Sequence, residues 1–221
     1  MEPQSYTLPL SHNICQPDNF NHVAIIVHGG CFIGGSANWD KQLAELLYNN
    51  GIVAVRTYFS GANLESSLRD LGTLTKDIIN KYNAPPLSLI GISSGGFLAH
   101  ALLDEVEYQF RAYIGICPMI NPYRSYKYLC EQPDEVFMRL KHLEYFNTER
   151  NIRQMSRCYS PQSIDRRADK MYIIAGRKDE IVPSYIVDDY QEYFDIFWYD
   201  NGHELCKKPE VFARDILQML N

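Results

Sequence analysis

The sequence contains no run of apolar residues long enough to cross a bilayer, so a membrane-spanning helix is not expected. Residues 1–10 show no basic segment followed by an apolar one, so a signal peptide is not expected either. Internal repeats and low-complexity segments are also missing. These absences leave a globular protein, and 221 residues with 46% hydrophobic content suffice for one domain over residues 1–221.

Cysteine pairs and an excess of positive charge are missing as well. The six cysteines form no C-x-x-C pair, and their scatter is typical of neither a zinc site nor a disulfide framework. Free thiols in a reducing cytoplasm are the simplest interpretation, which predicts a cytoplasmic protein. The 21 basic and 27 acidic side chains give a net charge of −6, so a nucleic-acid partner is not expected.

Apolar, β-branched segments typical of strands buried on both faces recur along the chain. They cover residues 23–27, 52–55, 87–92, 112–117, 171–175 and 195–199. Segments with helical spacing separate them, the longest over residues 64–82 and the last beginning at Pro209. This alternation predicts a three-layer α/β/α sandwich, in which a mostly parallel sheet has helices on both faces and binds ligands at the carboxyl ends of its strands.

Two segments depart from this alternation. Residues 1–20 are polar and contain three prolines, which predicts an irregular arm that holds at most a short edge strand. Residues 118–170 hold no segment typical of a buried strand, and helical spacing is visible only around residues 136–146. Because the chain leaves the sheet after Cys117 and returns at Met171, we expect a helical cap inserted at about residues 118–170, over the carboxyl ends of the strands.

The predicted cap differs from the rest of the chain in charge. Residues 121–170 carry ten basic and seven acidic side chains, a net charge of +3 in a chain of −6. Two interpretations remain open. The cap is either a positive lid that attracts an anionic substrate, or a solvated face whose charges pair with one another.

The segment Gly91-Ile92-Ser93-Ser94-Gly95 lies between a predicted strand and the helix that follows it. This G-x-S-x-G pattern is typical of a sharp turn, in which the glycines avoid clashes and the serine hydroxyl is pushed out above the sheet. The N–H groups at the start of the next helix point to the same place. Ser93 is therefore a candidate nucleophile beside an anion site, as acyl transfer requires, although a simple Gly/Ser turn has the same pattern.

A serine nucleophile needs a base, and six histidines are available. His203 directly follows the last predicted strand, so it can reach the carboxyl edge of the sheet. His100 points away along the helix after Ser93, and His28 belongs to a glycine-rich loop in which a structural role is expected. No supporting pattern surrounds the other three, His12, His22 and His142. We therefore predict His203 as the base.

The base in turn needs an orienting carboxylate. Asp179 lies in the loop after the penultimate strand, within the pattern G-x-x-D-x-x-V-P. An aspartate in a polar turn is common. However, the chain order Ser93, Asp179, His203 is the order expected of an enzyme with a G-x-S-x-G turn. Asp179 is therefore the predicted acid, and Glu180 is its nearest competitor.

An oxyanion hole requires backbone N–H donors around the reacting carbonyl oxygen. The residue after the nucleophile, Ser94, is expected to supply one of them. The glycine-rich loop after the first strand is expected to supply the others, from Gly30 and Cys31. A phosphate-binding loop is the competing interpretation, but the sequence has neither G-x-G-x-x-G nor G-K-[ST].

The patterns H-G-G-x-F-x-G-G-S, G-x-S-x-G-G, G-x-x-D-x-x-V-P and G-H-E, in this order, resemble the α/β-hydrolase superfamily. Within it the chain is similar to the hormone-sensitive-lipase-like and kynurenine-formamidase-like esterases, over nearly its whole length except the arm and the cap. The resemblance implies the α/β-hydrolase fold, the Ser93, Asp179 and His203 triad, and oxyanion donors at Gly30, Cys31 and Ser94. Cys31 departs from this pattern, which has a third glycine there, and Ser94 replaces the usual alanine.

The expected function is a serine hydrolase that cleaves a small-molecule carboxylic ester through an acyl-enzyme, without a metal or organic cofactor. An amidase or formamidase, a thioesterase or a small peptidase would use the same residues, because the leaving-group pocket that separates these activities lies in the cap. A binding protein with this fold is the remaining alternative. Such proteins typically lose a member of the triad, and here all three are present.

Overall fold

The computed structural model describes residues 13–30, 40–59, 64–132, 149–162 and 167–221. Within these ranges, strands and helices follow one another in the alternating order that the sequence predicts. They are β1 (Asn13–Cys15), β2 (His22–Val27), α1 (Lys41–Asn49), β3 (Ile52–Arg56), α2 (Leu64–Lys81), β4 (Leu87–Ile92), α3 (Ser94–Glu105), β5 (Phe110–Ile116), α4 (Pro122–Cys130), α6 (Glu149–Cys158), β6 (Ala168–Gly176), α7 (Ser184–Asp188), β7 (Asp195–Tyr199), the 3₁₀-helix η2 (His203–Lys207) and α8 (Pro209–Leu220).

Seven strands of the described residues form one sheet, in the order β1-β3-β2-β4-β5-β6-β7. The edge strand β1 pairs antiparallel with β3, and every other neighbouring pair is parallel. The middle strand is β4, which ends directly before Ser93. Ser93 therefore leaves the sheet at the centre of its carboxyl edge, where open parallel sheets bind their ligands.

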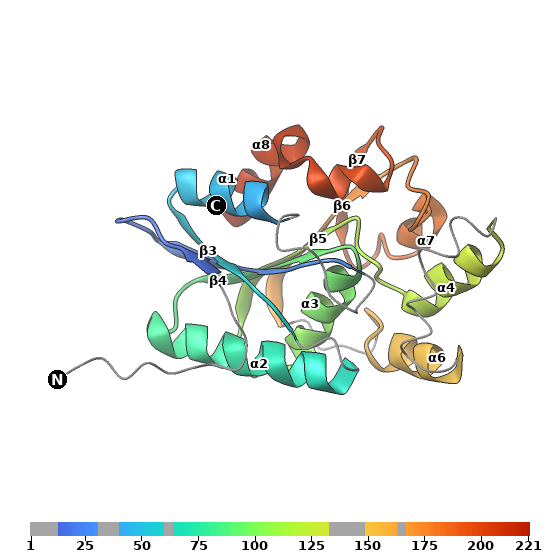
Figure 1. The fold of residues 1–221 in the computed structure, drawn as a ribbon, viewed down its shortest axis with the longest axis horizontal. Helices are drawn as coiled ribbons and strands as arrows, with labels where there is room; N and C mark the ends of the chain where they lie inside the picture. The colour runs from blue at the N-terminus through green and yellow to red at the C-terminus, as the bar shows by residue number, and fades with distance from the viewer. Residues whose placement is uncertain (1–12, 31–39, 60–63, 133–148, 163–166) are drawn as a thin grey trace.

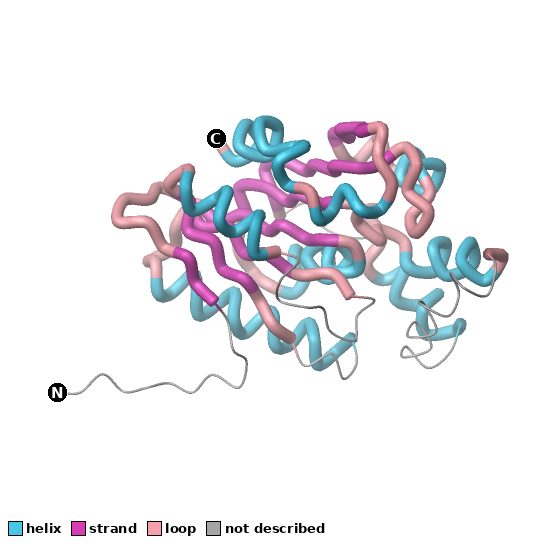
Figure 2. Tube along the Cα trace, turned by 45° about the horizontal axis from the view of Figure 1, so that its top comes forward, coloured by secondary structure: helices cyan, strands magenta, loops and turns pink. Residues whose placement is uncertain are grey.

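The strands β2, β3 and β4 are buried over their whole length because the sheet is covered on both faces. Successive residues of a strand point to opposite faces. In β2, Val23, Ile25 and Val27 pack in a cluster with α2 and α3, whereas Ala24 and Ile26 pack in a second cluster with α1 and α8. Figures 1 and 2 show the sheet between these two layers of helices. The predicted three-layer α/β/α sandwich is confirmed.

The observed strand limits largely follow the apolar segments of the sequence. The limits of β2, β3, β4 and β7 lie within one residue of the prediction, since these segments are mostly apolar. The strands β2, β3 and β4 are fully buried, whereas β7 is part-buried at the edge of the sheet. In contrast, β5 begins at Phe110 and β6 at Ala168, earlier than the predicted residues 112 and 171. Phe110 pairs with Ala168 in the sheet, but the next residues of β6, Asp169 and Lys170, are exposed. Their polar side chains hide the start of the strand in the sequence.

The segment between β5 and β6 forms α4 and α6, which pack against each other at the right of Figure 1, beyond the carboxyl ends of the strands. A hydrogen bond from Asn121 Nδ2 to Tyr190 Oη (2.7 Å) and an ion pair between Arg124 and Asp189 attach α4 to the residues at and after the end of α7. The predicted helical segment at residues 136–146 lies outside the described residues. Treating residues 118–170 as a cap remains a prediction.

Candidate active site

Ser93 lies in a strained turn between β4 and α3. Its backbone has φ 53° and ψ −121°, a conformation that residues other than glycine rarely adopt. Two hydrogen bonds hold it there, from Ser93 N to Ile116 O and from Met119 N to Ser93 O, both 2.9 Å. The residue is 5% exposed. The fold thus presents one hydroxyl at the centre of the carboxyl edge, in the turn that the G-x-S-x-G pattern predicts.

Gly95, in the same turn, has no room for a side chain. A Cβ added at Gly95 would lie 2.2 Å from the carbonyl oxygen of Val27 and 2.3 Å from that of His28. These distances are far below ordinary contact, so the turn and the end of β2 pack backbone against backbone. Close packing of this kind brings the glycine-rich loop after β2 next to Ser93.

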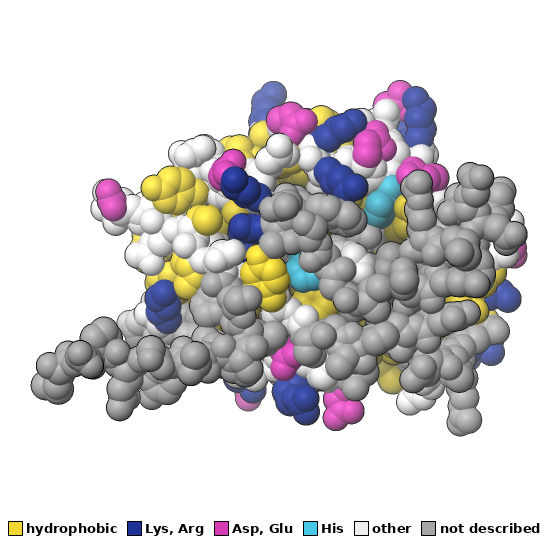
Figure 3. All heavy atoms as spheres, in the orientation of Figure 1, with side chains coloured by type: hydrophobic (Ala, Val, Ile, Leu, Met, Phe, Trp, Pro, Cys, Tyr) yellow, Lys and Arg dark blue, Asp and Glu magenta, His cyan; other side chains and the backbone are white. Residues whose placement is uncertain are grey.

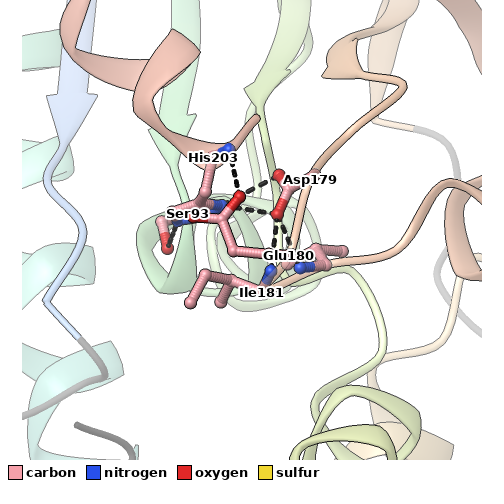
Figure 4. A network of polar contacts seen from close by, with 6 residues as sticks. Ser93, Asp179, Glu180, Ile181 and His203 are labelled. Atoms are coloured by element: carbon pink, nitrogen blue, oxygen red, sulfur yellow. Dashed lines mark hydrogen bonds and ion pairs between the residues drawn. The ribbon is translucent and has the colours of Figure 1, made fainter. Parts of the chain in front are cut away.

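His203 begins η2, just after β7, and its ring reaches the serine. The distance from Ser93 Oγ to His203 Nε2 is 2.9 Å, and the distances from His203 Nδ1 to Asp179 Oδ2 and Oδ1 are 2.9 and 3.0 Å (Figure 4). A carboxylate only accepts hydrogen bonds, so Nδ1 carries the ring hydrogen of a neutral imidazole and Nε2 is free to accept from Ser93. The three predicted residues therefore form one hydrogen-bonded chain with the polarity that base catalysis requires.

Asp179 is fixed by the loop that carries it. Its Oδ1 accepts hydrogen bonds from the backbone N–H groups of Ile181 (2.9 Å) and Val182 (2.8 Å), and the residue is 7% exposed. These bonds hold the carboxylate against the His203 ring. The competing residue, Glu180, does not reach the ring. Its Oε2 accepts instead from the backbone N–H of His203, at 3.0 Å.

The candidate oxyanion donors lie around the turn. Ser94 is the first residue of α3, so its backbone N–H is at the start of that helix. Gly30 has φ 122°, which favours glycine. A Cβ on the preceding Gly29 would lie 3.0 Å from Ser93 Cβ, which places this loop against the candidate nucleophile. Cys31 lies outside the described residues. The three donors remain a prediction.

The other described histidines are buried elsewhere. His28 Nδ1 donates to Gly29 O (2.6 Å) and its ring stacks on Phe59, while burial lowers its pKa, so it is a neutral support of the glycine loop. Burial lowers the pKa of His22 and of His100 to about 4. His22 hydrogen-bonds with Ser88 Oγ (2.9 Å), and His100 packs against Tyr113. His12 and His142 lie outside the described residues.

One residue of the site has no counterpart in the sequence prediction. Cys117 directly follows β5 with φ 44°, and its Sγ, an Asp179 oxygen and a His203 ring nitrogen lie within 4.8 Å of one another. These atoms are of the types that bind zinc. However, Asp179 and His203 already bond each other, and burial, with the nearby Asp179 carboxylate, raises the Cys117 thiol pKa well above its usual value. The protonated thiol is better suited to packing under the acid than to holding a metal.

Along the upper edge of the face that Figure 3 shows, basic and acidic side chains are interspersed, so no single sign of charge prevails there. Within the described ranges, no helix is both long and apolar enough to cross a membrane.

A family model and several solved structures match this chain. A sequence search of curated proteins found no match. The model of an uncharacterised protein family, UPF0227, matches residues 46–220. The chain belongs to this family. The match covers β3 to α8 and so includes Ser93, Asp179 and His203, whereas the glycine-rich loop lies before it.

Solved structures similar to this UPF0227 chain include esterases. Esterase B from Lactobacillus rhamnosis has a TM-score of 0.71 at 14% identity, covering 95% of this chain and 79% of that one. Est1E from Butyrivibrio proteoclasticus has a TM-score of 0.67 at 16% identity and covers 95% of both chains. XC6422 from Xanthomonas campestris, a serine hydrolase without a lid, has a TM-score of 0.66 at 18% identity, covering 95% and 87%. With the mostly parallel sheet, these matches establish the α/β-hydrolase fold. They do not single out the hormone-sensitive-lipase-like or kynurenine-formamidase-like branch, which stays a prediction.

Proposed function

We propose that this protein is a serine hydrolase that cleaves a carboxylic ester of a small molecule. One observation carries the proposal: the hydrogen-bonded chain from Ser93 Oγ through the His203 ring to the Asp179 carboxylate, at the centre of the carboxyl edge of the sheet. The serine lies in a strained turn at the start of a helix, next to a glycine-rich loop. Solved esterases with the same fold support the hydrolase class.

The reaction follows from the polarity of the chain. Ser93 Oγ attacks the carbonyl carbon of the ester while its proton passes to His203 Nε2. The negative oxygen of the tetrahedral intermediate accepts from the N–H of Ser94, and we assign Gly30 and Cys31 as further donors. His203 then gives the proton to the leaving alcohol, and an acyl-Ser93 ester remains. Water, activated by His203, hydrolyses this ester and restores Ser93.

Asp179 acts through His203. Its carboxylate keeps the hydrogen on Nδ1, so that Nε2 faces the serine, and it stabilises the imidazolium formed when the serine proton is transferred. None of these steps requires a metal or an organic cofactor. The same steps would cleave an amide or a thioester, so the leaving group has to be determined by experiment.

A substrate panel tests the proposal. Purified protein is given p-nitrophenyl esters of increasing acyl length, together with matched thioesters and anilides, and Ser93→Ala is measured in parallel. We expect the esters to be turned over fastest and Ser93→Ala to lose several orders of magnitude in kcat, without loss of the fold. Equal turnover of an ester by both proteins would contradict the proposal. Faster turnover of anilides or thioesters would keep the triad but change the substrate class.

A further inference from the structure

The loop that carries Asp179 and the loop that carries His203 lie side by side after β6 and β7. Past the ends of these strands, their backbones continue to pair, from Arg177 N to Tyr199 O (2.8 Å) and from Lys178 N to Asn201 O (2.9 Å). Two positions further along each loop, Glu180 Oε2 accepts from the backbone N–H of His203 at 3.0 Å (Figure 4). Beyond the last backbone pair, the Glu180 side chain thus connects the two loops.

We propose that Glu180 is a positioning residue for His203. Two adjacent acids then hold His203: Asp179 bonds to the imidazole ring, and Glu180 bonds to the His203 backbone N–H. The inference rests on the proposed function, because it assigns Glu180 a role in placing the base for Ser93.

The backbone N–H of His203 needs an acceptor from outside its own helix. His203 is the first residue of η2, and the first N–H groups of a helix have no partner within it. The residue before it, Gly202, has no side chain that could cap the helix. Glu180 supplies the acceptor from the neighbouring loop, and a bond to a carboxylate is stronger than one to a neutral group.

The glycine at position 202 leaves room for this contact. A Cβ there would lie 2.8 Å from Glu180 Oε2 and 2.6 Å from Glu204 Oε2. Gly202 has φ −87°, which any residue adopts, so its backbone conformation does not call for glycine. The Glu180 and Glu204 carboxylates both lie beside its Cα, so a side chain at position 202 would move them.

Other charges surround the contact but do not share its geometry. Lys178 is paired with Asp200 (2.8 Å) and faces away into solvent. The carboxylate of Glu204, next to His203, accepts hydrogen bonds from its own backbone, from the Gly202 backbone and from the Asn201 side chain. These bonds lower the pKa of Glu204. Glu204 therefore offers a matched control, as a carboxylate of similar exposure beside His203 that does not accept from its N–H.

Kinetics with p-nitrophenyl acetate test the inference. We expect Glu180→Ala to lower kcat by about 10-fold or more, because small displacements of a catalytic group are costly. KM should change little, since Glu180 is assigned no contact with the substrate. Glu180→Gln keeps an oxygen that can accept and should recover most of the lost kcat. Glu204→Gln should stay within about 3-fold of the unaltered protein, which is the scatter expected of a surface change.

Exchange of the His203 backbone amide with deuterium, followed by NMR, gives a second measurement that does not depend on activity. We expect this amide to exchange faster in Glu180→Ala than in the unaltered protein, and Glu180→Gln to lie between them. If the protein cleaves no ester, the proposed function fails, while this measurement still decides whether Glu180 holds the His203 backbone.

Gly202→Ala tests the same contact from the other side. Its methyl group should displace the Glu180 carboxylate and give the kinetics and exchange of Glu180→Ala. The inference is overturned if Glu180→Ala keeps both kcat and the exchange rate of the His203 amide. It is equally overturned if Glu180→Gln and Glu204→Gln lose as much kcat as Glu180→Ala, since loss of negative charge would then be the cause. Thermal unfolding of each variant checks that it is folded.

Discussion

The triad loops and the segment between β5 and β6 meet at the same edge of the sheet, yet they are held in different ways. Around the triad, backbone groups do most of the holding, at the Ser93 turn, at the Asp179 turn and between the acid and histidine loops. The α4 and α6 helices are attached by side chains, through buried Leu129 and Ile152 and the partly exposed pair of Arg124 with Asp189.

The two regions should therefore differ in which sequence changes they tolerate. Where backbone groups hold the site, glycine is needed at close contacts such as Gly95, because any other side chain would clash. A carboxylate is needed at Asp179, because it accepts both from the loop backbone and from the His203 ring. A segment held by side chains, as α4 and α6 are, can exchange residues and keep its place. We therefore expect the chemistry to be set by the sheet and the selectivity by the segment over residues 118–170.

The largest effect is expected at the acid. Asp179→Asn should lower kcat/KM by about 10³- to 10⁴-fold, because an amide in place of the carboxylate favours the wrong imidazole tautomer and cannot stabilise the imidazolium. Steady-state kinetics on an ester that the unaltered protein cleaves measures this, and circular dichroism checks the fold. Activity within about 10-fold of the unaltered protein would mean that Asp179 is not the acid.

The next effect is on stability, at the contact between the Ser93 turn and β2. Gly95→Ala should destabilise the protein by about 3 kcal/mol or more, since its methyl group would lie 2.2 Å from the oxygen of Val27. Gly72 in α2 is the matched control, because the nearest atom to an added Cβ lies 3.9 Å away. Gly72→Ala should stabilise by up to about 1 kcal/mol. Urea unfolding measures both, and equal effects would show that close backbone packing does not hold the turn.

The fully buried His100 joins the two regions, since it lies in α3 and hydrogen-bonds the backbone of Tyr159 after α6. Burial lowers the pKa of His100 from 6.5 to about 4. Between pH 4 and pH 6.5, the unfolded chain therefore binds more protons at this residue than the folded protein does. Stability should therefore fall as the pH drops from 6.5 towards 4, by about 3 kcal/mol for this group. In urea unfolding at pH 7 and 4.5, His100→Phe should lose less stability than the unaltered protein. Burial also lowers the pKa of His22 to about 4, so both proteins should still lose some stability at low pH. The same loss in both proteins would refute this account of His100.

The smallest effect is expected at Arg124. Its partner is Asp189, and its guanidinium lies 5.9 Å from the centre of the Tyr185 ring, which supports the paired alternative for this one charge of the predicted cap. Arg124→Gln should change stability by less than about 1 kcal/mol. It should leave the ratio of kcat/KM for an anionic and a neutral ester unchanged, as should Lys127→Gln on the same helix. A loss confined to the anionic ester and reduced by salt would revive the positive lid.

The sequence predicts the sheet well because burial on both faces leaves a strong pattern. Strands such as β2 and β4 are buried from end to end and mostly apolar, and the glycines around Ser93 mark its turn. Near the start of β6, Asp169 and Lys170 are exposed, so no such pattern marks this part of the strand. The edge strand β1 is three residues long and only part-buried, and it was expected at most as part of an irregular arm.

The site is predictable to the extent that chain order fixes it. The loops after β4, β6 and β7 carry Ser93, Asp179 and His203, and topology brings those loops to one edge. The contacts of Cys117 and Glu180 depend on how neighbouring strands pair, for example Gly176 with Tyr199 between β6 and β7. A single sequence does not contain that register, so Glu180 was a rival acid in the sequence and is a backbone acceptor in the structure.

The central claim is that Ser93 is the nucleophile and that its position comes from the sheet. The most direct measurement is covalent labelling of the folded protein with a fluorophosphonate, which forms a phosphonyl ester with an activated serine, followed by peptide mass spectrometry. We expect a single adduct on Ser93, strongly reduced in His203→Ala. Labelling of Ser94 or Cys31 in place of Ser93, or labelling of Ser93 that is as fast without His203, would contradict it.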